Sequence, residues 1–565
     1  MSNTFDRRTL VHCLLNWEYH TPDNIWLTQP IGNSQVKTYT WKQAADTVRR
    51  LAHYLISLDL PPHSNIVLLG KNSAEWLLAD LAIMAAGHVS VPVYYTMNAE
   101  NLRYVIEHSE ARLMIIGKLD GSTDTWPDMK QGVPDALPKI TLPFAPPVAN
   151  AVSLDSIIKN YSPLTNDDLK LPQPEDLATI MYTSGSTGRA KGVMHNQQNM
   201  INAAKHGHGV FPLSPDDRIL SYLPLAHAAE RFIVGTIAPY YGVQVYFTES
   251  LDTFLQDLQR ARPTIFFSVP RLWVKFQQGI NAKLPPKLQN AVFKVPVLSK
   301  FAKKFILKKL GLDHVRIAAT GSAPLAPDII NWYRKLGLTL QDAYGMTENF
   351  AYSHLSRLGQ VRTGSVGHAC PEVECKISEQ GEILVKSPAT MLGYYKDLEK
   401  TAEAIDKDNF LRTGDMGSID KDGFLFITGR VKDLFKTSKG KYVAPVPIEQ
   451  LLSNHPHTES VCVVGSNLNS PVALVMLSEE SVAKLQQHAS HQQELTSSYD
   501  ELLTHINQQL EAHEKLAKLV LITERWSIEN DLLTPTLKIR RHQIEQHYHT
   551  QVPEWESAQT KIVWA

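Results

Sequence analysis

Short apolar segments and longer amphipathic segments alternate in the N-terminal part of the chain, and this order is the strongest constraint on the fold. Residues 39–60 carry apolar side chains at helical spacing. Residues 64–70 and 88–95 predict buried strands, and residues 73–86 predict a helix that opens with a serine N-cap. Residues 98–116 repeat the order of helix and strand. Because strands that alternate with helices usually pair in parallel, the sequence predicts an α/β protein.

The rest of the chain adds a long irregular stretch and a second type of unit. Residues 117–176 are rich in Pro, Asp and Ser and predict excursions over the surface. Residues 264–273 predict a strand that runs into a helix, and their aromatic side chains fit a hydrophobic core better than an acyl tunnel. Towards the C-terminus, strands at 459–465 and 472–477 and a helix at 498–519 predict a small α+β unit.

Length and composition narrow the class of protein. A chain of 565 residues is too long for one ordinary core, so at least two domains are expected. A net charge of -1 gives no reason to expect a nucleic-acid partner. The four cysteines lack paired spacing, which is typical of reduced thiols in a cytoplasmic protein.

No apolar run reaches the length that a membrane helix needs. Residues 300–309 nevertheless interleave Phe301 and Phe305 with lysines, as a basic amphipathic helix does. This run is expected to be a solvated helix face, and transient attraction to an anionic bilayer is the alternative. Peripheral membrane contact therefore stays open.

A Ser/Thr/Gly-rich stretch follows a short apolar segment at residues 179–192, TIMYTSGSTGRAKG. Gly185 and Gly188 lack a Cβ, so the backbone N–H groups can approach a phosphate group closely. Thr187 adds a hydroxyl donor and Lys191 adds a positive charge. A Walker A loop needs four residues between its first glycine and a Gly-Lys pair, and the spacing here does not fit. The stretch therefore predicts a nucleotide site of another kind.

The segment YTSGSTGRAKG resembles the phosphate loop of the adenylate-forming, AMP-binding superfamily. The resemblance runs from about residue 39 to residue 548. It implies a large N-terminal domain of layered sheets and helices, residues 1–431, and a small mobile α+β C-terminal domain, residues 432–565. Ala190 stands where the family usually has Pro, and His195 and Asn196 replace the commoner Leu-Ser/Thr-His ending. The resemblance implies nucleotide contacts from Thr183, Ser184, Gly185, Ser186, Thr187, Gly188 and Lys191.

Three later segments carry further resemblances, the first to the long-chain fatty acyl-CoA synthetases and the other two to the adenylate-forming superfamily as a whole. In residues 221–231, SYLPLAHAAER, the resemblance places His227 beside the bound acid and adenylate. Glu230 and Arg231 of the same segment are adjacent and could pair with each other. Residues 315–324 resemble the segment that lies along the adenine, and residues 339–348 the segment that binds adenine and magnesium. The residues implied are Gly321, Ala323, Pro324, Asp342, Ala343, Tyr344, Gly345, Thr347 and Glu348.

Four residues of the third segment receive specific roles from the resemblance. Tyr344 would stack on adenine, and Gly345 would leave room for the acyl carbonyl. Thr347 would contact the α-phosphate. Glu348, with Thr187, would hold Mg²⁺, which prefers oxygen ligands and takes few of them from protein.

The C-terminal motifs concern the ribose, the hinge and the adenylation lysine. Asp415 can accept both ribose hydroxyls, and the resemblance makes Arg430 a second ribose contact. Lys432 lies where the superfamily has its hinge. The following loop, with Gly440, would complete the thioester site. Lys538, in TPTLKIRR at residues 534–541, matches the adenylation lysine.

The resemblance implies a two-step ligase that uses ATP, Mg²⁺ and CoA. The motifs shared with the long-chain enzymes imply a long-chain fatty acid as substrate, which would become acyl-AMP and then acyl-CoA. The alternative substrates are a medium-chain or aryl acid, and the alternative acceptor is an acyl carrier protein. Luciferase-like oxidation is a more distant alternative. A catalytically silent nucleotide- or lipid-binding protein would be expected to lack Lys538, Glu348 or Asp415, and all three are present. The sequence leaves the oligomeric state open.

Overall fold

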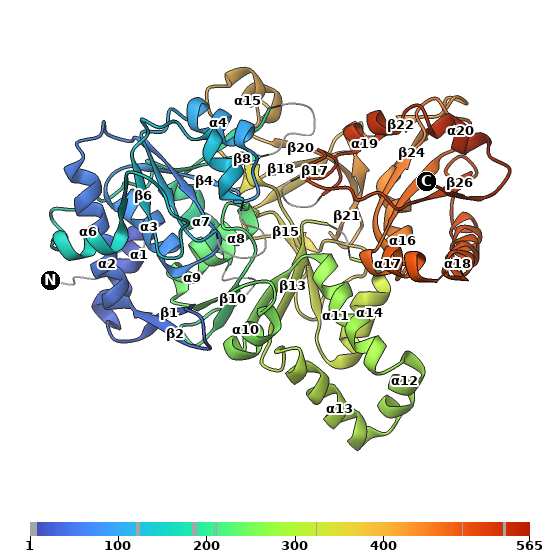
Figure 1. Cartoon of the computed structure of the whole chain (residues 1–565), viewed down its shortest axis with the longest axis horizontal. Coiled ribbons are helices and arrows are strands. Elements are labelled where there is room, and N and C mark those ends of the chain that lie inside the picture. Colours follow the sequence, from blue (N-terminus) through green and yellow to red (C-terminus); the bar gives the residue numbers. More distant parts are fainter. Residues whose placement is uncertain are drawn as a thin grey trace.

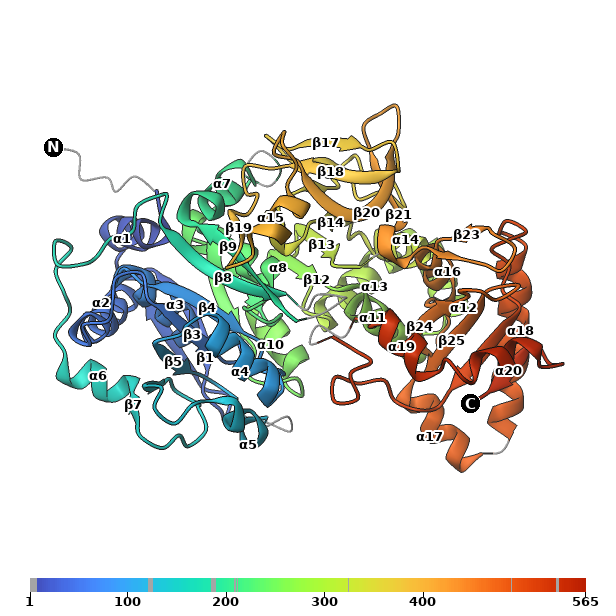
Figure 2. The ribbon, with the colours of Figure 1, turned by 90° about the horizontal axis from the view of Figure 1, so that it is seen from above.

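The computed structural model describes residues 8–119, 125–183, 189–207, 210, 212–323, 325–488, 490–534 and 538–565. Two large sheets and a smaller antiparallel sheet form the body of the molecule, and a separate sheet lies near the C-terminus (Figure 1). The C-terminal part, orange to red, lies at one end of the long axis in both views (Figure 2).

The first large sheet has the strand order β16-β15-β14-β13-β12-β10-β11-β1-β2. Its central strands run parallel, whereas β2, β15 and β16 are antiparallel to their neighbours. The strands are β1 (Ile25–Pro30), β2 (Val36–Thr40), β10 (Arg218–Ser221), β11 (Gln244–Phe247), β12 (Ile265–Ser268), β13 (Ile317–Gly321), β14 (Leu340–Tyr344), β15 (His354–Leu355) and β16 (His368–Ala369).

The second large sheet has the order β19-β9-β8-β4-β3-β5-β6-β7. It is parallel from β8 to β7, and β9 turns back antiparallel to β8. The strands are β3 (Asn65–Leu69), β4 (Val89–Val93), β5 (Leu113–Ile116), β6 (Lys139–Thr141), β7 (Ala151–Ser153), β8 (Leu177–Thr183), β9 (Lys191–Asn196) and β19 (Gly393–Tyr394).

Helices cover both large sheets, and α3 is buried along its whole length because it contacts β1 of the first sheet as well as β3 and β4 of the second. Those up to the antiparallel sheet are α1 (Leu10–His20), α2 (Trp41–Ser57), α3 (Ala74–Ala85), α4 (Ala99–His108), α5 (Trp126–Met129), η1 (Lys130–Gly132), α6 (Leu154–Asn160), α7 (Gln197–Gly207), α8 (Ala228–Phe232), η2 (Ile233–Ile237), α9 (Ala238–Tyr241), α10 (Phe254–Ala261), α11 (Pro270–Lys283), α12 (Pro286–Lys294), α13 (Pro296–Lys309), α14 (Pro327–Leu336), η3 (Thr347–Asn349) and α15 (Leu398–Ala404).

The antiparallel sheet consists of β17 (Glu374–Ile377), β18 (Glu382–Lys386), β20 (Leu411–Ile419) and β21 (Leu425–Arg430), and the short turn η4 (Val431–Asp433) leads out of it. The C-terminal part has a hairpin and a mixed sheet with its own hydrophobic core. Its elements are β22 (Phe435–Lys436), β23 (Tyr442–Val443), α16 (Pro445–Leu452), β24 (Thr458–Val464), β25 (Val472–Leu477), α17 (Glu479–Gln487), α18 (Ser490–Asn507), β26 (Lys518–Ile522), α19 (Arg541–His547), α20 (Val552–Ser557) and β27 (Ile562–Trp564).

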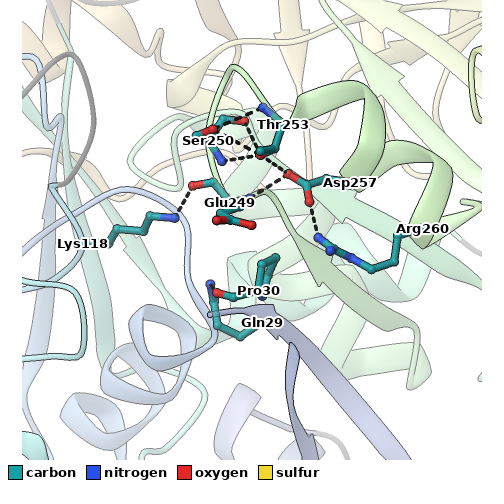
Figure 3. A network of polar contacts seen from close by, with 8 residues as sticks. All are labelled: Gln29, Pro30, Lys118, Glu249, Ser250, Thr253, Asp257 and Arg260. Atoms are coloured by element: carbon teal, nitrogen blue, oxygen red, sulfur yellow. Dashed lines mark hydrogen bonds and ion pairs between the residues drawn. The ribbon is translucent and has the colours of Figure 1, made fainter. Parts of the chain in front are cut away.

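A polar network joins the ends of strands from the two large sheets (Figure 3). Lys118, just after β5, is buried and donates a hydrogen bond to the backbone carbonyl of Glu249, just after β11. The Asp257 carboxylate of α10 accepts the Glu249 N–H at 2.8 Å and the Thr253 hydroxyl at 2.8 Å. The network therefore connects these two edges, and the buried Lys118 ammonium and Asp257 carboxylate both have hydrogen-bond partners.

The alternation predicted for the N-terminal part is confirmed. β3, α3, β4, α4 and β5 follow one another, and Ser73 caps α3 by accepting the Trp76 N–H at 3.2 Å. The aromatic side chains of β12 and α11 mostly enter the core, since Phe266 and Trp273 are fully buried.

Two predictions were wrong. Residues 117–176 are more than surface excursions, because β6 and β7 extend the second sheet. Strands of three residues are too short to show a period, and pairing with β5 determines them. Residues 498–519 are not helical throughout. The helix α18 ends at Asn507, whose side chain accepts the Leu516 N–H at 2.9 Å, and the chain then enters β26.

No helix in the described part of the chain combines the length and the apolar character needed to cross a membrane. All four cysteines are described, and the structure joins none of them in a disulfide.

Candidate nucleotide and acyl-adenylate site

The predicted phosphate loop connects two antiparallel strands. β8 ends at Thr183 and β9 begins at Lys191, and these two residues are register partners. The strands therefore hold the two ends of the loop together. The loop residues themselves, Ser184, Gly185, Ser186, Thr187 and Gly188, lie outside the described residues, as does Pro324 of the adenine segment.

Lys191 and Glu348 lie on either side of the Tyr394 side chain. The Lys191 ammonium is 4.5 Å from the centre of the Tyr394 ring, and the Tyr394 hydroxyl donates to Glu348 Oε1 at 2.8 Å. Burial and the neighbouring Glu348 carboxylate raise the pKa of Tyr394, so its hydroxyl keeps its proton and remains a donor. One tyrosine thus positions both the predicted phosphate lysine and the predicted magnesium ligand.

Thr347 is held from the opposite direction by His195 of β9. The His195 ring is fully buried and its Nε2 donates to the Thr347 carbonyl at 2.7 Å. Burial lowers the pKa of His195 to about 4, so the ring is neutral near pH 7. Its Nδ1 has no hydrogen-bond partner among the described residues. His195, which departs from the usual family pattern, therefore places a neutral imidazole against the backbone of Thr347, the predicted α-phosphate contact.

The adenine segments lie side by side at the ends of two parallel strands. Gly321 of β13 and Ala343 of β14 are register partners, and Ala323 is exposed two residues beyond Gly321. Burial raises the pKa of Asp342 to about 7. A Cβ on Gly345 would lie 2.6 Å from the Ala351 backbone, so close packing alone requires glycine there. Room for an acyl carbonyl at Gly345 stays a prediction.

The Asp415 carboxylate is buried between two donors. The Tyr344 hydroxyl donates to one oxygen at 2.7 Å, and Arg430 Nε donates to the other at 2.9 Å. Asp415 and Arg430 are register partners on β20 and β21, which fixes this pair. Each carboxylate oxygen can accept more than one hydrogen bond, so Asp415 retains capacity for ribose hydroxyls.

Lys538 of the C-terminal part reaches the same place. The Lys538 side chain has solvent-accessible surface, but many protein atoms surround it and displace part of its hydration. This desolvation, followed by the charge of Arg430, lowers the pKa of Lys538 to about 8, and the charge of Asp415 opposes the shift. The Thr534 N–H donates to the Lys538 carbonyl at 2.8 Å, and the three residues between them lie outside the described part of the chain.

His227, the N-cap of α8, lies close enough to this lysine for the Lys538 charge to affect its pKa. Burial, and then the Lys538 charge, lower the pKa of His227 to about 4. The Ala229 N–H donates to His227 Nδ1 at 3.2 Å, so the neutral ring carries its proton on Nε2. His227 is therefore set up to donate a hydrogen bond from Nε2.

The structure thus brings together residues from distant segments of the chain, and the comparisons with known proteins agree with this arrangement. The model of the AMP-binding enzyme family matches residues 16–395, and that of the AMP-binding enzyme C-terminal domain matches residues 432–559. The chain belongs to the AMP-binding enzyme family.

Two relatives extend over most of this AMP-binding enzyme. The long-chain-fatty-acid–CoA ligase FadD15 of Mycobacterium bovis is 29% identical, covering 91% of each chain. The fatty acyl-CoA synthetase A of Dictyostelium discoideum is 30% identical, covering 91% of this chain and 85% of its own. Among solved structures, the A-PCP didomain of the carboxylic acid reductase from Segniliparus rugosus, in complex with AMP, matches with a TM-score of 0.78 and 21% identity, covering 98% of this chain and 82% of its own. This last likeness shows the fold.

The pairing of Glu230 with Arg231, which the sequence left open, does not occur: each residue has other partners. Glu230 accepts hydrogen bonds from Ser221 at 2.8 Å and from Asn72 at 3.2 Å. Arg231 instead forms a buried ion pair with Asp80 of α3 at 2.8 Å. Consecutive helical residues point in different directions, so each finds its own partner. Burial raises the pKa of Glu230 to about 8.

The predicted hinge and thioester loop lie just beyond the antiparallel sheet. Lys432 is exposed in η4, between β21 and the first hairpin of the C-terminal part. Gly440 turns this hairpin between β22 and β23, with a φ of +76° that favours glycine. Neither residue contacts the cluster around Asp415 in the described contacts.

Sequence reasoning missed three residues that position the site. Nothing in the sequence placed Tyr394 in the site, and His195 was noted only as a departure from the family pattern. Asn72, whose amide donates to Ser221, Leu223 and Glu230, holds the loop that carries His227. Only the position of Asn72 directly after a predicted strand could have drawn attention to it, since strand ends often carry functional groups in α/β proteins.

Proposed function

We propose that this AMP-binding enzyme is an ATP-dependent acid–thiol ligase that converts a long-chain fatty acid into its CoA thioester, with AMP and pyrophosphate as the other products. The observation that carries the proposal is the convergence of His227, Asp415 with Arg430, and Lys538. The names of the relatives support a fatty acid as the substrate.

ATP binds with its adenine against Tyr344 and the ends of β13 and β14. Asp415 accepts the ribose hydroxyls, and Arg430 both holds Asp415 and contacts the ribose. Thr183, Thr347 and Lys191 approach the phosphates together with the loop residues 184–188. A carboxylate and a hydroxyl fit the oxygen preference of Mg²⁺, and Glu348 with Thr187 would hold the ion, which neutralises phosphate charge when bound.

In the first step a carboxylate oxygen of the fatty acid attacks the α-phosphorus of ATP. The new oxygen–phosphorus bond forms as the bond to pyrophosphate breaks, giving acyl-AMP. Lys538 supplies positive charge at the phosphate and acyl oxygens, and the Nε2–H of His227 donates a hydrogen bond to the same region. Both groups act in a partly desolvated site, where such contacts stabilise developing charge most strongly.

In the second step the CoA sulfur attacks the acyl carbon, its thiol proton is lost, and AMP leaves. We place the boundary between the domains at Lys432 and propose that the C-terminal domain turns about it, so that the Gly440 hairpin replaces the Lys538 loop at the site. The exposure of Lys432 and the separate hydrophobic core of the C-terminal part support this motion.

The proposal is tested by pyrophosphate release from ATP and Mg²⁺ across fatty and aromatic acids, each with and without CoA. We expect release to be greatest with a long-chain fatty acid and sustained turnover to require CoA. Preference for an aryl or medium-chain acid would show that the substrate is not a long-chain fatty acid. Turnover only with an acyl carrier protein would show that this protein, and not CoA, is the acceptor. Silence with every acid would favour a nucleotide- or lipid-binding protein without catalysis.

We also propose a cytoplasmic location with peripheral contact to a membrane. The substrate favours this, because long-chain fatty acids partition into lipid. The composition supports no nucleic-acid partner.

A further inference from the structure

The helices α12 and α13 form a hairpin that projects from the lower edge of the molecule in Figure 1. The two helices contact each other, and α13 contacts α14 of the body. Ile306 of α13 and the following Leu310 are buried in a cluster with Trp273 and Tyr333. The inner side of the hairpin is therefore fixed to the body, and its outer side does not contribute to that core.

The outer side of the hairpin is unusually apolar for an exposed surface. Val297, Phe301 and Phe305 are 71%, 69% and 61% exposed, and they are spaced four residues apart along one side of α13. Val295, between the helices, and Leu298, in the first turn of α13, are also exposed, and α12 adds Leu288. Large apolar side chains that gather in this way mark an interaction surface.

Positive charge surrounds this apolar surface without any negative charge in the same helices. Residues 286–309 contain seven lysines and no Asp or Glu, in a chain whose net charge is -1. Lys300, Lys304 and Lys308 are also spaced four residues apart, so they form a row beside the apolar one. The acid-free stretch extends from residue 258 to residue 312 and includes twelve lysines and arginines.

We propose that the outer side of the α12–α13 hairpin docks onto a lipid bilayer that contains anionic phospholipid. This inference rests on the proposed function, because it assigns the membrane contact of that function to one surface. Docking itself requires neither ATP nor CoA. Phe301, Phe305 and the apolar turn enter the interfacial layer, while the lysine row contacts the lipid phosphates. A bilayer fits better than a nucleic acid or an acidic protein because aliphatic side chains occupy the tip, where those partners offer no apolar layer.

The test is co-sedimentation of the full-length protein with phosphatidylcholine vesicles, with and without phosphatidylglycerol, in the absence of ATP and CoA. We expect binding only to the anionic vesicles, and weaker binding as salt increases. The double variant Phe301→Ser/Phe305→Ser should lower the affinity about tenfold or more, because two inserted rings are lost. The variant Lys300→Glu/Lys304→Glu/Lys308→Glu should abolish binding.

A matched control removes exposed leucines elsewhere. Leu251 and Leu398 are 83% and 86% exposed and lie outside the hairpin. The variant Leu251→Ser/Leu398→Ser should bind vesicles as the wild type does. Circular dichroism of each variant checks folding, and unchanged helix content is expected because the replaced side chains lie outside the core.

Two results would overturn the proposal. In the first, the wild-type protein stays in the supernatant with anionic vesicles at low salt. In the second, the wild-type protein binds anionic vesicles and the variant Phe301→Ser/Phe305→Ser binds them with the same affinity. Binding would then rest on charge attraction alone, which a nucleic acid or an acidic protein would also provide. Pyrophosphate release, measured separately with dispersed substrate, reports the proposed function independently of this binding.

Discussion

The environment of Lys538 lowers the pKa of its side chain, and this has a direct consequence for the reaction. Its pKa is lowered to about 8, so the ammonium form predominates below that pH and is lost above it. If the charge stabilises the transition state, kcat/KM for pyrophosphate release from the free enzyme should fall as pH rises through about 8. Lys538→Arg should keep partial activity without this alkaline decline, because a guanidinium stays protonated.

Removal of the charge separates the two half-reactions. Lys538→Ala should slow adenylation by about 10² to 10³, the usual effect of losing one transition-state donor. Thioester formation from synthetic acyl-AMP and CoA should be much less affected. Both rates are measurable by rapid-quench assays on the same preparation, and an equal loss in both would contradict the role assigned to Lys538.

Tyr394 makes a different contribution, because it acts through Glu348. In Tyr394→Phe the ring beneath Lys191 remains, but Glu348 loses its 2.8 Å hydrogen bond. The Mg²⁺ concentration for half-maximal pyrophosphate release should rise about tenfold, as is usual when a partner of a metal ligand is removed. Tyr395→Phe, at the next position, is the matched control and should leave the Mg²⁺ requirement unchanged. A rise in the KM for fatty acid alone would contradict this role.

Between elements, the ion pair of Arg231 and Asp80 ties α8, and with it the His227 loop, to α3. Both side chains are buried, and Trp76 of α3 lies 5.4 Å from the guanidinium. Asp80→Leu should destabilise the fold by about 3–5 kcal/mol, because it leaves an unpaired buried charge. The double variant Asp80→Leu/Arg231→Met should recover most of this loss.

Urea unfolding followed by tryptophan fluorescence checks this expectation. Arg362→Ala is a suitable control, because Arg362 forms exposed ion pairs with Asp420 and Asp422, whose loss should shift the unfolding midpoint only slightly. If Asp80→Leu unfolds no more easily than Arg362→Ala, the pair does not hold α8 in place.

The elements that the sequence predicted share a physical cause. β3 and β5 are inner strands of a parallel sheet and every residue in them is buried, so they appear as continuous apolar runs that composition alone reveals. β6 and β7 could not be found in this way, because three residues carry no period and pairing determines them. The adjacency of Lys538 to His227 depends on how two domains close, and no local pattern encodes it. The motif resemblance alone identified both residues, and Tyr394 needed the structure.

The arrangement of the whole molecule depends on contacts between α11 of the body and the C-terminal domain. Arg271 of α11 forms an ion pair with Glu459 of β24, and Glu479 and Arg525 are close enough to influence the pKa of Arg271, which burial lowers. These contacts exist in the same arrangement that places Lys538 beside His227. They should therefore favour the adenylation state over the thioester state.

Breaking this ion pair should shift that balance. Because Arg271 is almost half exposed, the pair should contribute at most about 1 kcal/mol, which corresponds to roughly fivefold in the population of the closed state. Arg271→Glu should slow adenylation by up to about fivefold and leave thioester formation from acyl-AMP unchanged or faster. The charge swap Arg271→Glu/Glu459→Arg should restore adenylation, whereas Arg412→Glu, which affects a pair within the N-terminal domain, should change neither rate. If Arg271→Glu slows both half-reactions and the swap restores neither, the closed arrangement is not specific to adenylation, and the Lys538 loop must reach the site by another path.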